Sequence, residues 1–304
     1  MKEYTMRQIW KILPAAFMLL ASITAAAADK LPVVASFSIL GDLVSVIGGE
    51  RVSVSTLVGP DQDAHMFEPS PADAKKIAQS KLVVINGLGF DHWLTRLSGA
   101  AGYKGETVVA SSGIRVRQMP DEDHPGKMHI DPHAWQNPLN VIVYAGNIAA
   151  ALGKIDPAGV HYYQSHLQRY VQSLKELDDW SRQQFAQIPA AKRKVITSHD
   201  AFGYLGARYQ IVFLAPQGVS TESEASARDV AKLIRQIRHE RIKAVHVENM
   251  SNPKLLQQLS REAGVAMGSK LYADALSGPG EAAPSYLRMM RYNVEQLMLG
   301  LRRN

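Results

Sequence analysis

The chain has 304 residues, of which 46% are hydrophobic, and its 34 Lys and Arg against 28 Asp and Glu give a formal net charge of +6. It contains no cysteine, which excludes disulfides, thiolate zinc sites and a lipidated N-terminal cysteine. The basic residues are scattered, with no Lys/Arg run interleaved with aromatic residues, so we expect no nucleic-acid binding.

The first 28 residues are typical of a secretory signal peptide. Lys2, Arg7 and Lys11 precede an apolar run over residues 12–20, and four alanines at 25–28 end the segment. A transmembrane anchor is the alternative, but the apolar stretch is shorter than the roughly 20 residues that span a bilayer. We therefore expect a cleavable signal peptide (1–28) on an exported, periplasmic protein that is not a lipoprotein.

Strand and helix patterns alternate through the first half of the remaining chain. Short apolar or alternating runs predict strands at residues 31–37, 52–58, 81–86 and 107–110. A helix is expected after Ser70, which is a favoured N-cap residue and is followed by proline at the first helical position. Strands that alternate with helices favour parallel βαβ units.

A long helical pattern separates the two halves. Residues 118–130 are predicted to be a polar, flexible loop, and a helix is expected after Pro138. The next helical pattern, of about 30 residues, gives a rod of roughly 45 Å, longer than a single lobe requires. We interpret residues 156–189 as a rigid connecting helix between an N-terminal lobe (29–155) and a C-terminal lobe (190–304).

The second half repeats the alternation of strands and helices. Asp200 is interpreted as the N-cap of a short helix. The predicted strands are at 194–197, 211–214 and 243–247, and the predicted helices at 224–238, 253–263 and 286–302. The expected fold is therefore α/β, with two lobes that each hold a parallel four-stranded sheet flanked by helices.

Four polar residues lie in the connections between these elements. His65 and His199 each follow a predicted strand, His133 precedes a predicted helix, and Asp274 follows an apolar stretch. Because open α/β sheets bind ligands at the edge where strand-to-helix connections lie, we expect the four side chains to meet, two from each lobe, in the cleft between the lobes. Three imidazoles and one carboxylate suit a borderline divalent metal such as zinc.

The segments that hold these residues carry a family resemblance. They are DAHMFEPSP at 63–71, DPHAW at 131–135, SHDAFGY at 198–204, VHVE at 245–248 and LYADALS at 271–277. Together they resemble the metal-binding solute-binding proteins of bacterial ABC importers, the zinc/manganese group also called cluster A-I, over essentially all of residues 31–303. The resemblance implies two metal-binding lobes joined by one long helix, with ligands at His65, His133, His199 and Asp274. It also implies capture of a divalent metal and its delivery to an ABC permease in the inner membrane.

His199 bears on which metal is bound. Manganese-selective members of the group typically carry glutamate at this position, because manganese favours carboxylate oxygen whereas imidazole suits zinc. The residues here favour Zn²⁺ as the transported ion, with Mn²⁺ as the alternative. Many zinc members also have a histidine-rich loop before the second motif, whereas residues 118–130 hold only His124 and His129.

Two carboxylates are expected to support the ligating imidazoles. A ligating histidine usually donates its second N–H to a carboxylate or a carbonyl, which fixes the tautomer. We expect Asp131 and Glu248 to act in this way.

A periplasmic zinc-dependent hydrolase is the rival function. Such an enzyme needs an open coordination position and a positioned acid or base, and the sequence contains neither a His-Glu-x-x-His nor a Gly-x-Ser-x-Gly motif. A closed four-ligand site suits binding rather than hydrolysis. We therefore expect a monomeric metal carrier and not an enzyme.

Overall fold

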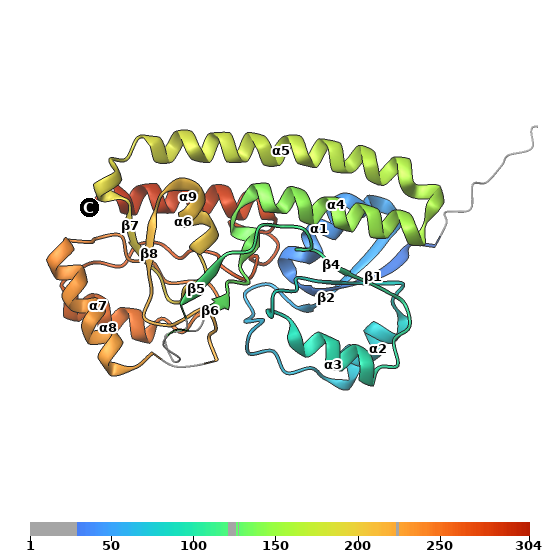
Figure 1. Cartoon of the computed structure of the whole chain (residues 1–304), viewed down its shortest axis with the longest axis horizontal. Coiled ribbons are helices and arrows are strands. Elements are labelled where there is room, and N and C mark those ends of the chain that lie inside the picture. The colour runs from blue at the N-terminus through green and yellow to red at the C-terminus, as the bar shows by residue number, and fades with distance from the viewer. Residues whose placement is uncertain (1–28, 121–125, 127, 223–224) are drawn as a thin grey trace, which may run out of the picture.

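Two lobes lie side by side beneath a layer of long helices (Figure 1). This arrangement is that of a computed structural model, which describes residues 29–120, 126, 128–222 and 225–304. The predicted signal peptide, 1–28, lies outside the described residues. The helical layer consists of α4 (Pro138–Ile155), α5 (Val160–Ala186) and α9 (Tyr286–Leu301).

The connecting helix is α5, which extends above both lobes in Figure 1. Its 27 residues lie within the predicted range of 156–189, and a 3-10 turn (Pro157–Gly159) precedes it. It contacts α4 and α1 on the side of the N-terminal lobe and α6 and α9 on the side of the C-terminal lobe. The α4 helix is apolar enough by composition to cross a membrane, but it packs here against α5 and α1.

The N-terminal lobe holds the predicted four-stranded parallel sheet. Its strand order is β2-β1-β3-β4, with every pair parallel. The central strand β1 is buried from Val33 to Phe37, as expected for a parallel sheet covered on both faces. The elements of this lobe are β1 (Leu31–Phe37), α1 (Ser38–Gly48), β2 (Val52–Val58), α2 (Pro71–Gln79), β3 (Leu82–Ile85), α3 (His92–Ala100) and β4 (Glu106–Val109).

The C-terminal lobe has a shorter parallel sheet. Its two described strands, β7 (Lys194–Ile196) and β8 (Val212–Leu214), pair in parallel. Single parallel bridges add Val245 beside Ile196, and Leu271 beside Glu248. The predicted strand at 243–247 is thus reduced to a bridge. The helices of this lobe are α6 (Gly203–Tyr209), α7 (Ala227–Glu240) and α8 (Lys254–Ala263).

Two local predictions are wrong. Asp200 is not an N-cap, because α6 begins at Gly203 and residue 200 is instead bonded through its backbone N–H to the carbonyl of Gly218. The predicted loop at 118–130 is not a loop at its two ends, because β5 (Gln118–Pro120) and β6 (Met128–Ile130) form an antiparallel pair, and residues 121–125 and 127 lie outside the described residues. His124 lies outside the described residues.

The buried hydrophobic side chains form two clusters. The larger one joins the N-terminal sheet to α4, α5, α6 and α9. The smaller one belongs to β7, α7, α8 and the bridge segment at Val245.

Candidate metal centre

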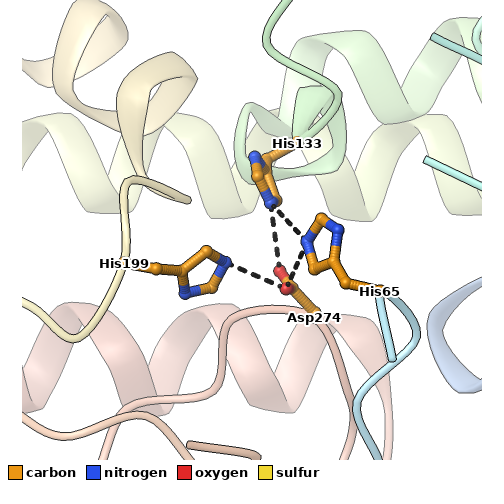
Figure 2. Close-up of side chains that lie close together, drawn as sticks. All are labelled: His65, His133, His199 and Asp274. Atoms are coloured by element: carbon orange, nitrogen blue, oxygen red, sulfur yellow. Dashed lines mark hydrogen bonds and ion pairs between the residues drawn. The ribbon is translucent and has the colours of Figure 1, made fainter. Parts of the chain in front are cut away.

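Four side chains from four separate connections converge between the lobes (Figure 2). Asp274 Oδ2 lies 3.3 Å from His65 Nε2 and 3.1 Å from His199 Nε2, and Asp274 Oδ1 lies 3.7 Å from His133 Nε2. One ligand atom from each of the four residues lies within 4.8 Å of the other three. The structure therefore brings all four predicted site residues together, two from each lobe.

The four ligand atoms are hidden from solvent, and several have no hydrogen-bond partner. His133, His199 and Asp274 are fully buried, and His65 is 9% exposed. His199 Nε2 and both carboxylate oxygens of Asp274 make no hydrogen bond. Buried polar groups are costly when they are left unpaired. A divalent cation at the centre would satisfy them, so this donor set fits a metal ion.

His65 is positioned by its own loop. Its backbone N–H donates to Asp63 Oδ1 at 2.9 Å, and the carbonyl of Ala64 accepts from Trp93 Nε1 at 3.1 Å. The imidazole meets the Phe90 ring edge-on, with 4.7 Å between the ring centroids. These contacts leave His65 Nε2 pointing at Asp274 (Figure 2).

His133 is held from behind by Asp131, one of the two carboxylates expected to support a ligating imidazole. Asp131 Oδ1 accepts from the backbone N–H of His133 at 3.0 Å and lies 2.9 Å from His133 Nδ1. Arg117 donates to Asp131 Oδ2 at 2.9 Å. Burial alone would raise the pKa of Asp131, but His133 and Arg117 outweigh it and hold that pKa below its usual value. An ionised Asp131 on Nδ1 leaves His133 Nε2 free to face the centre.

Glu248 plays the same part for His199. Its Oε1 accepts from the backbone N–H groups of Ser198 at 2.9 Å and His199 at 3.1 Å, and its Oε2 is hydrogen-bonded to His199 Nδ1. The single parallel bridge between Glu248 and Leu271 places this carboxylate behind the imidazole. Glu248 is 49 residues from His199 in the sequence, so only the fold establishes the contact.

Asp274 is fixed through the residue before it. The carbonyl of Ala273 accepts from Trp135 Nε1 at 2.9 Å and from Gln136 Nε2 at 2.8 Å. No role was expected for either donor from the sequence, although Trp135 is the last residue of the DPHAW segment and Gln136 directly follows it. They connect the Asp274 segment to the segment that carries His133.

The carboxylates and imidazoles of the site shift each other's pKa values in opposite directions. Burial would raise the pKa of Asp274, but His199 and His133 outweigh it and hold that pKa well below its ordinary value. Burial would lower the pKa of His199, but Glu248 and Asp274 outweigh it and raise that pKa well above its ordinary value. Asp274 is therefore an anionic side chain, and a metal ion at this site would compete with a proton for His199.

The other histidines of the described residues lie outside this cluster. His246 is buried, and its Nδ1 is 2.7 Å from the carbonyl of Ser269. His129 lies on β6 and is not among the four clustered residues.

Known proteins share both the sequence pattern and the fold. The family model described as "ZnuA: Zinc-uptake complex component A periplasmic" matches residues 33–299. The chain is 32% identical over 286 residues to the metal ABC transporter substrate-binding lipoprotein ScbA of Streptococcus cristatus, covering 92% of each chain. It is 32% identical over 279 residues to the manganese ABC transporter substrate-binding lipoprotein PsaA of Streptococcus pneumoniae, covering 90% of this chain and 89% of that one.

A solved structure extends the similarity to three dimensions. The periplasmic zinc binding protein TroA from Treponema pallidum superposes with a TM-score of 0.84 at 26% identity, covering 90% of this chain and 99% of that one. The two-lobe fold is thus shared with a metal-binding protein.

The relatives' names contradict one expectation. ScbA and PsaA are both named lipoproteins, which overturns the prediction of a protein that is not a lipoprotein. That prediction relied on the lack of cysteine in the chain. The chain is similar over about nine-tenths of its length to proteins named as lipoproteins.

Proposed function

This chain belongs to the ZnuA family of periplasmic zinc-uptake components, and from that membership we propose that it captures zinc with His65, His133, His199 and Asp274. Its relatives are substrate-binding proteins of metal ABC transporters. The chain is accordingly a substrate-binding protein that captures a divalent metal ion and delivers it to an ABC permease.

One observation carries the choice of ligands. Three imidazole nitrogens and one carboxylate from four loops lie within 4.8 Å of one another, and the atoms that face the centre include three buried ones without hydrogen-bond partners. Dehydrating such groups is costly unless a cation takes the place of water. The arrangement therefore favours metal capture over a purely structural role.

The donor types favour zinc over manganese. Three of the four residues offer imidazole nitrogen, which suits zinc, whereas manganese favours oxygen ligands. The relatives' names include both metals, since TroA is named for zinc and PsaA for manganese. A manganese carrier of the same kind is the alternative, and His199 is the residue that we expect to separate the two.

The surrounding residues support binding rather than catalysis. Asp131 and Glu248 accept from Nδ1 of two histidines and so present both Nε2 atoms to the metal. Four protein ligands around a tetrahedral ion leave no position for an activated water. We propose a monomeric carrier, without hydrolase activity, whose lobes are 29–155 and 190–304 with the connecting helix at 156–189.

Metal titration tests this assignment. Purified metal-free protein is titrated with Zn²⁺ and with Mn²⁺ by calorimetry, beside His133→Ala and the matched control His161→Ala, whose histidine is exposed on α5. We expect one zinc per chain, tighter binding of zinc than of manganese, and at least about tenfold weaker zinc binding in His133→Ala only.

Two results would count against the proposal. Equal zinc affinity in His133→Ala and the unmodified protein would remove His133 from the site. Tighter binding of manganese than of zinc would leave the site in place but assign the other metal.

A further inference from the structure

Hydrogen bonds on both sides of Asp274 fasten its segment to the N-terminal lobe. Before it, the Ala273 carbonyl accepts from the two side chains that follow His133 in the sequence by two and three positions. After it, the Leu276 N–H donates to Ser38 Oγ at 3.0 Å. The Asp274 segment is therefore hydrogen-bonded to the N-terminal lobe on both sides of Asp274, and it is also hydrogen-bonded to its own lobe through Asn249 Nδ2 and the Ala275 carbonyl at 3.2 Å.

His199 is bonded to Glu248 and also to the segment at 217–222. It forms a parallel bridge with Gln217, and the next residue, Asp200, donates its backbone N–H to the Gly218 carbonyl at 3.1 Å. These backbone contacts couple segment 217–222 to His199.

One carboxylate joins that segment to His65. Thr221 Oγ1 donates to Asp63 Oδ2 at 2.7 Å, across 158 residues of sequence. The other oxygen, Asp63 Oδ1, accepts from the backbone N–H of His65 at 2.9 Å. Asp63 thus connects the loop of one ligand to the segment that accompanies another.

This bond lies on the side of the site that faces solvent. A hollow of about 570 Å³ is lined by His65, the most exposed of the four proposed ligands, and also by Val219 and Ser220. A second hollow of about 530 Å³ is lined by Asp63 and Thr221 themselves. The segment with Thr221 therefore borders both hollows.

We propose that the hydrogen bond between Thr221 and Asp63 holds the solvent side of the metal site closed, so that these two positioning residues set the rate at which the metal leaves. Breaking the bond frees segment 217–222, and His199 with it, to separate from the other three ligands. Water then reaches the metal from the His65 side. The inference depends on the proposed function, because it requires a metal at this site.

Release kinetics test the proposal on the full protein loaded with one zinc. Excess EDTA is added and zinc release is followed for the unmodified protein, Thr221→Val, Thr221→Ser and Thr107→Val. Thr221→Val removes the hydroxyl at nearly constant shape, Thr221→Ser keeps the hydroxyl, and Thr107→Val makes the same change at an exposed position on β4. Because the acceptor is a carboxylate, we expect about tenfold faster release in Thr221→Val alone.

The outcomes separate the two proposals. A native release rate in Thr221→Val would overturn the role of the bond. A lower unfolding temperature of metal-free Thr221→Val, with a matching change in Thr221→Ser, would also overturn it, since that pattern marks a structural role. If the unmodified protein retained no zinc at all, the proposed function itself would fail.

Discussion

The two lobes differ in how their buried side chains are joined to the rest of the molecule. The N-terminal sheet shares one large hydrophobic cluster with the helical layer of α4, α5 and α9. The outer part of the C-terminal lobe, built from α7 and α8, has a smaller cluster of its own. The first lobe is therefore continuous with the connecting helix, whereas α7 and α8 are packed as a separate unit.

The residues of the proposed metal centre are therefore attached to the two hydrophobic clusters in different ways. Ala273 and Leu276, which flank Asp274, belong to the large cluster. His199 stands at the boundary, because Ile196 before it belongs to the small cluster and Ala201 after it to the large one. Of the four proposed ligands, two come from each lobe by sequence, but the residues flanking Asp274 pack in the large cluster, so we expect His199 to be the ligand best placed to move.

Truncation of a buried leucine in either cluster is expected to have the largest effect, a loss of folding stability. Leu259→Ala in the small cluster and Leu40→Ala in the large one remove fully buried side chains, and each should cost about 2–5 kcal/mol. Hydrogen exchange should show Leu259→Ala loosening α7 and α8 while β1 and β3 keep their protection, whereas Leu40→Ala weakens the large cluster. Equal loss of protection in both lobes after Leu259→Ala would mean that the clusters are not separate.

The two supporting carboxylates give the next largest effect. Glu248→Gln should weaken zinc binding about 10–100-fold. Asp131→Asn should weaken it less, because the His133 ring also packs against Trp135 and Phe90. Calorimetry on both variants, with the exposed Glu262→Gln as control, measures the difference. A larger loss of zinc affinity in Asp131→Asn than in Glu248→Gln would contradict the expectation that His133 is held more firmly than His199.

Substitution of His199 is expected to change the preference for zinc over manganese by less than the carboxylate substitutions change zinc affinity. Glutamate at position 199 would face Glu248, so the informative variant combines His199→Glu with Glu248→Gln to avoid two adjacent negative charges. Because manganese favours oxygen ligands, the zinc-over-manganese preference should fall by about tenfold. A competition titration measures the ratio, and an unchanged ratio would mean that His199 does not select the metal.

The pH dependence is the smallest expected effect. The pKa of His199 is raised in the folded protein. Protonated His199 therefore stabilises the metal-free fold, fully so at pH values below the ordinary histidine pKa. This stabilisation is lost as the pH rises through the raised pKa. Zinc requires the neutral imidazole. The zinc-induced rise in unfolding temperature should therefore be greater at about pH 8 than at about pH 6, by roughly 2–4 °C. Calorimetric scans at fixed zinc concentration measure this shift, and a smaller rise at the higher pH would contradict the assignment.

Much of the fold was predictable because local patterns control local structure. Continuous apolar runs placed the strands of the N-terminal sheet, and Ser70 with Pro71 marked the start of α2, where a capping box with Asp73 forms. The prediction for Asp200 was wrong because aspartate is a common N-cap residue, and the residue type alone does not show whether the backbone begins a helix there. Its backbone pairs instead with Gly218, a contact that no local pattern reveals.

The sequence by itself determined which residues could bind a metal, because residue type sets ligand chemistry and the loop motifs marked His65, His133, His199 and Asp274. Only the tertiary structure decided how these residues are held. The hydrogen bonds that join Ala273 to the segment after His133 and Thr221 to Asp63 span well over 100 residues. Such contacts depend on how the two hydrophobic clusters pack, and that packing is a property of the whole folded chain.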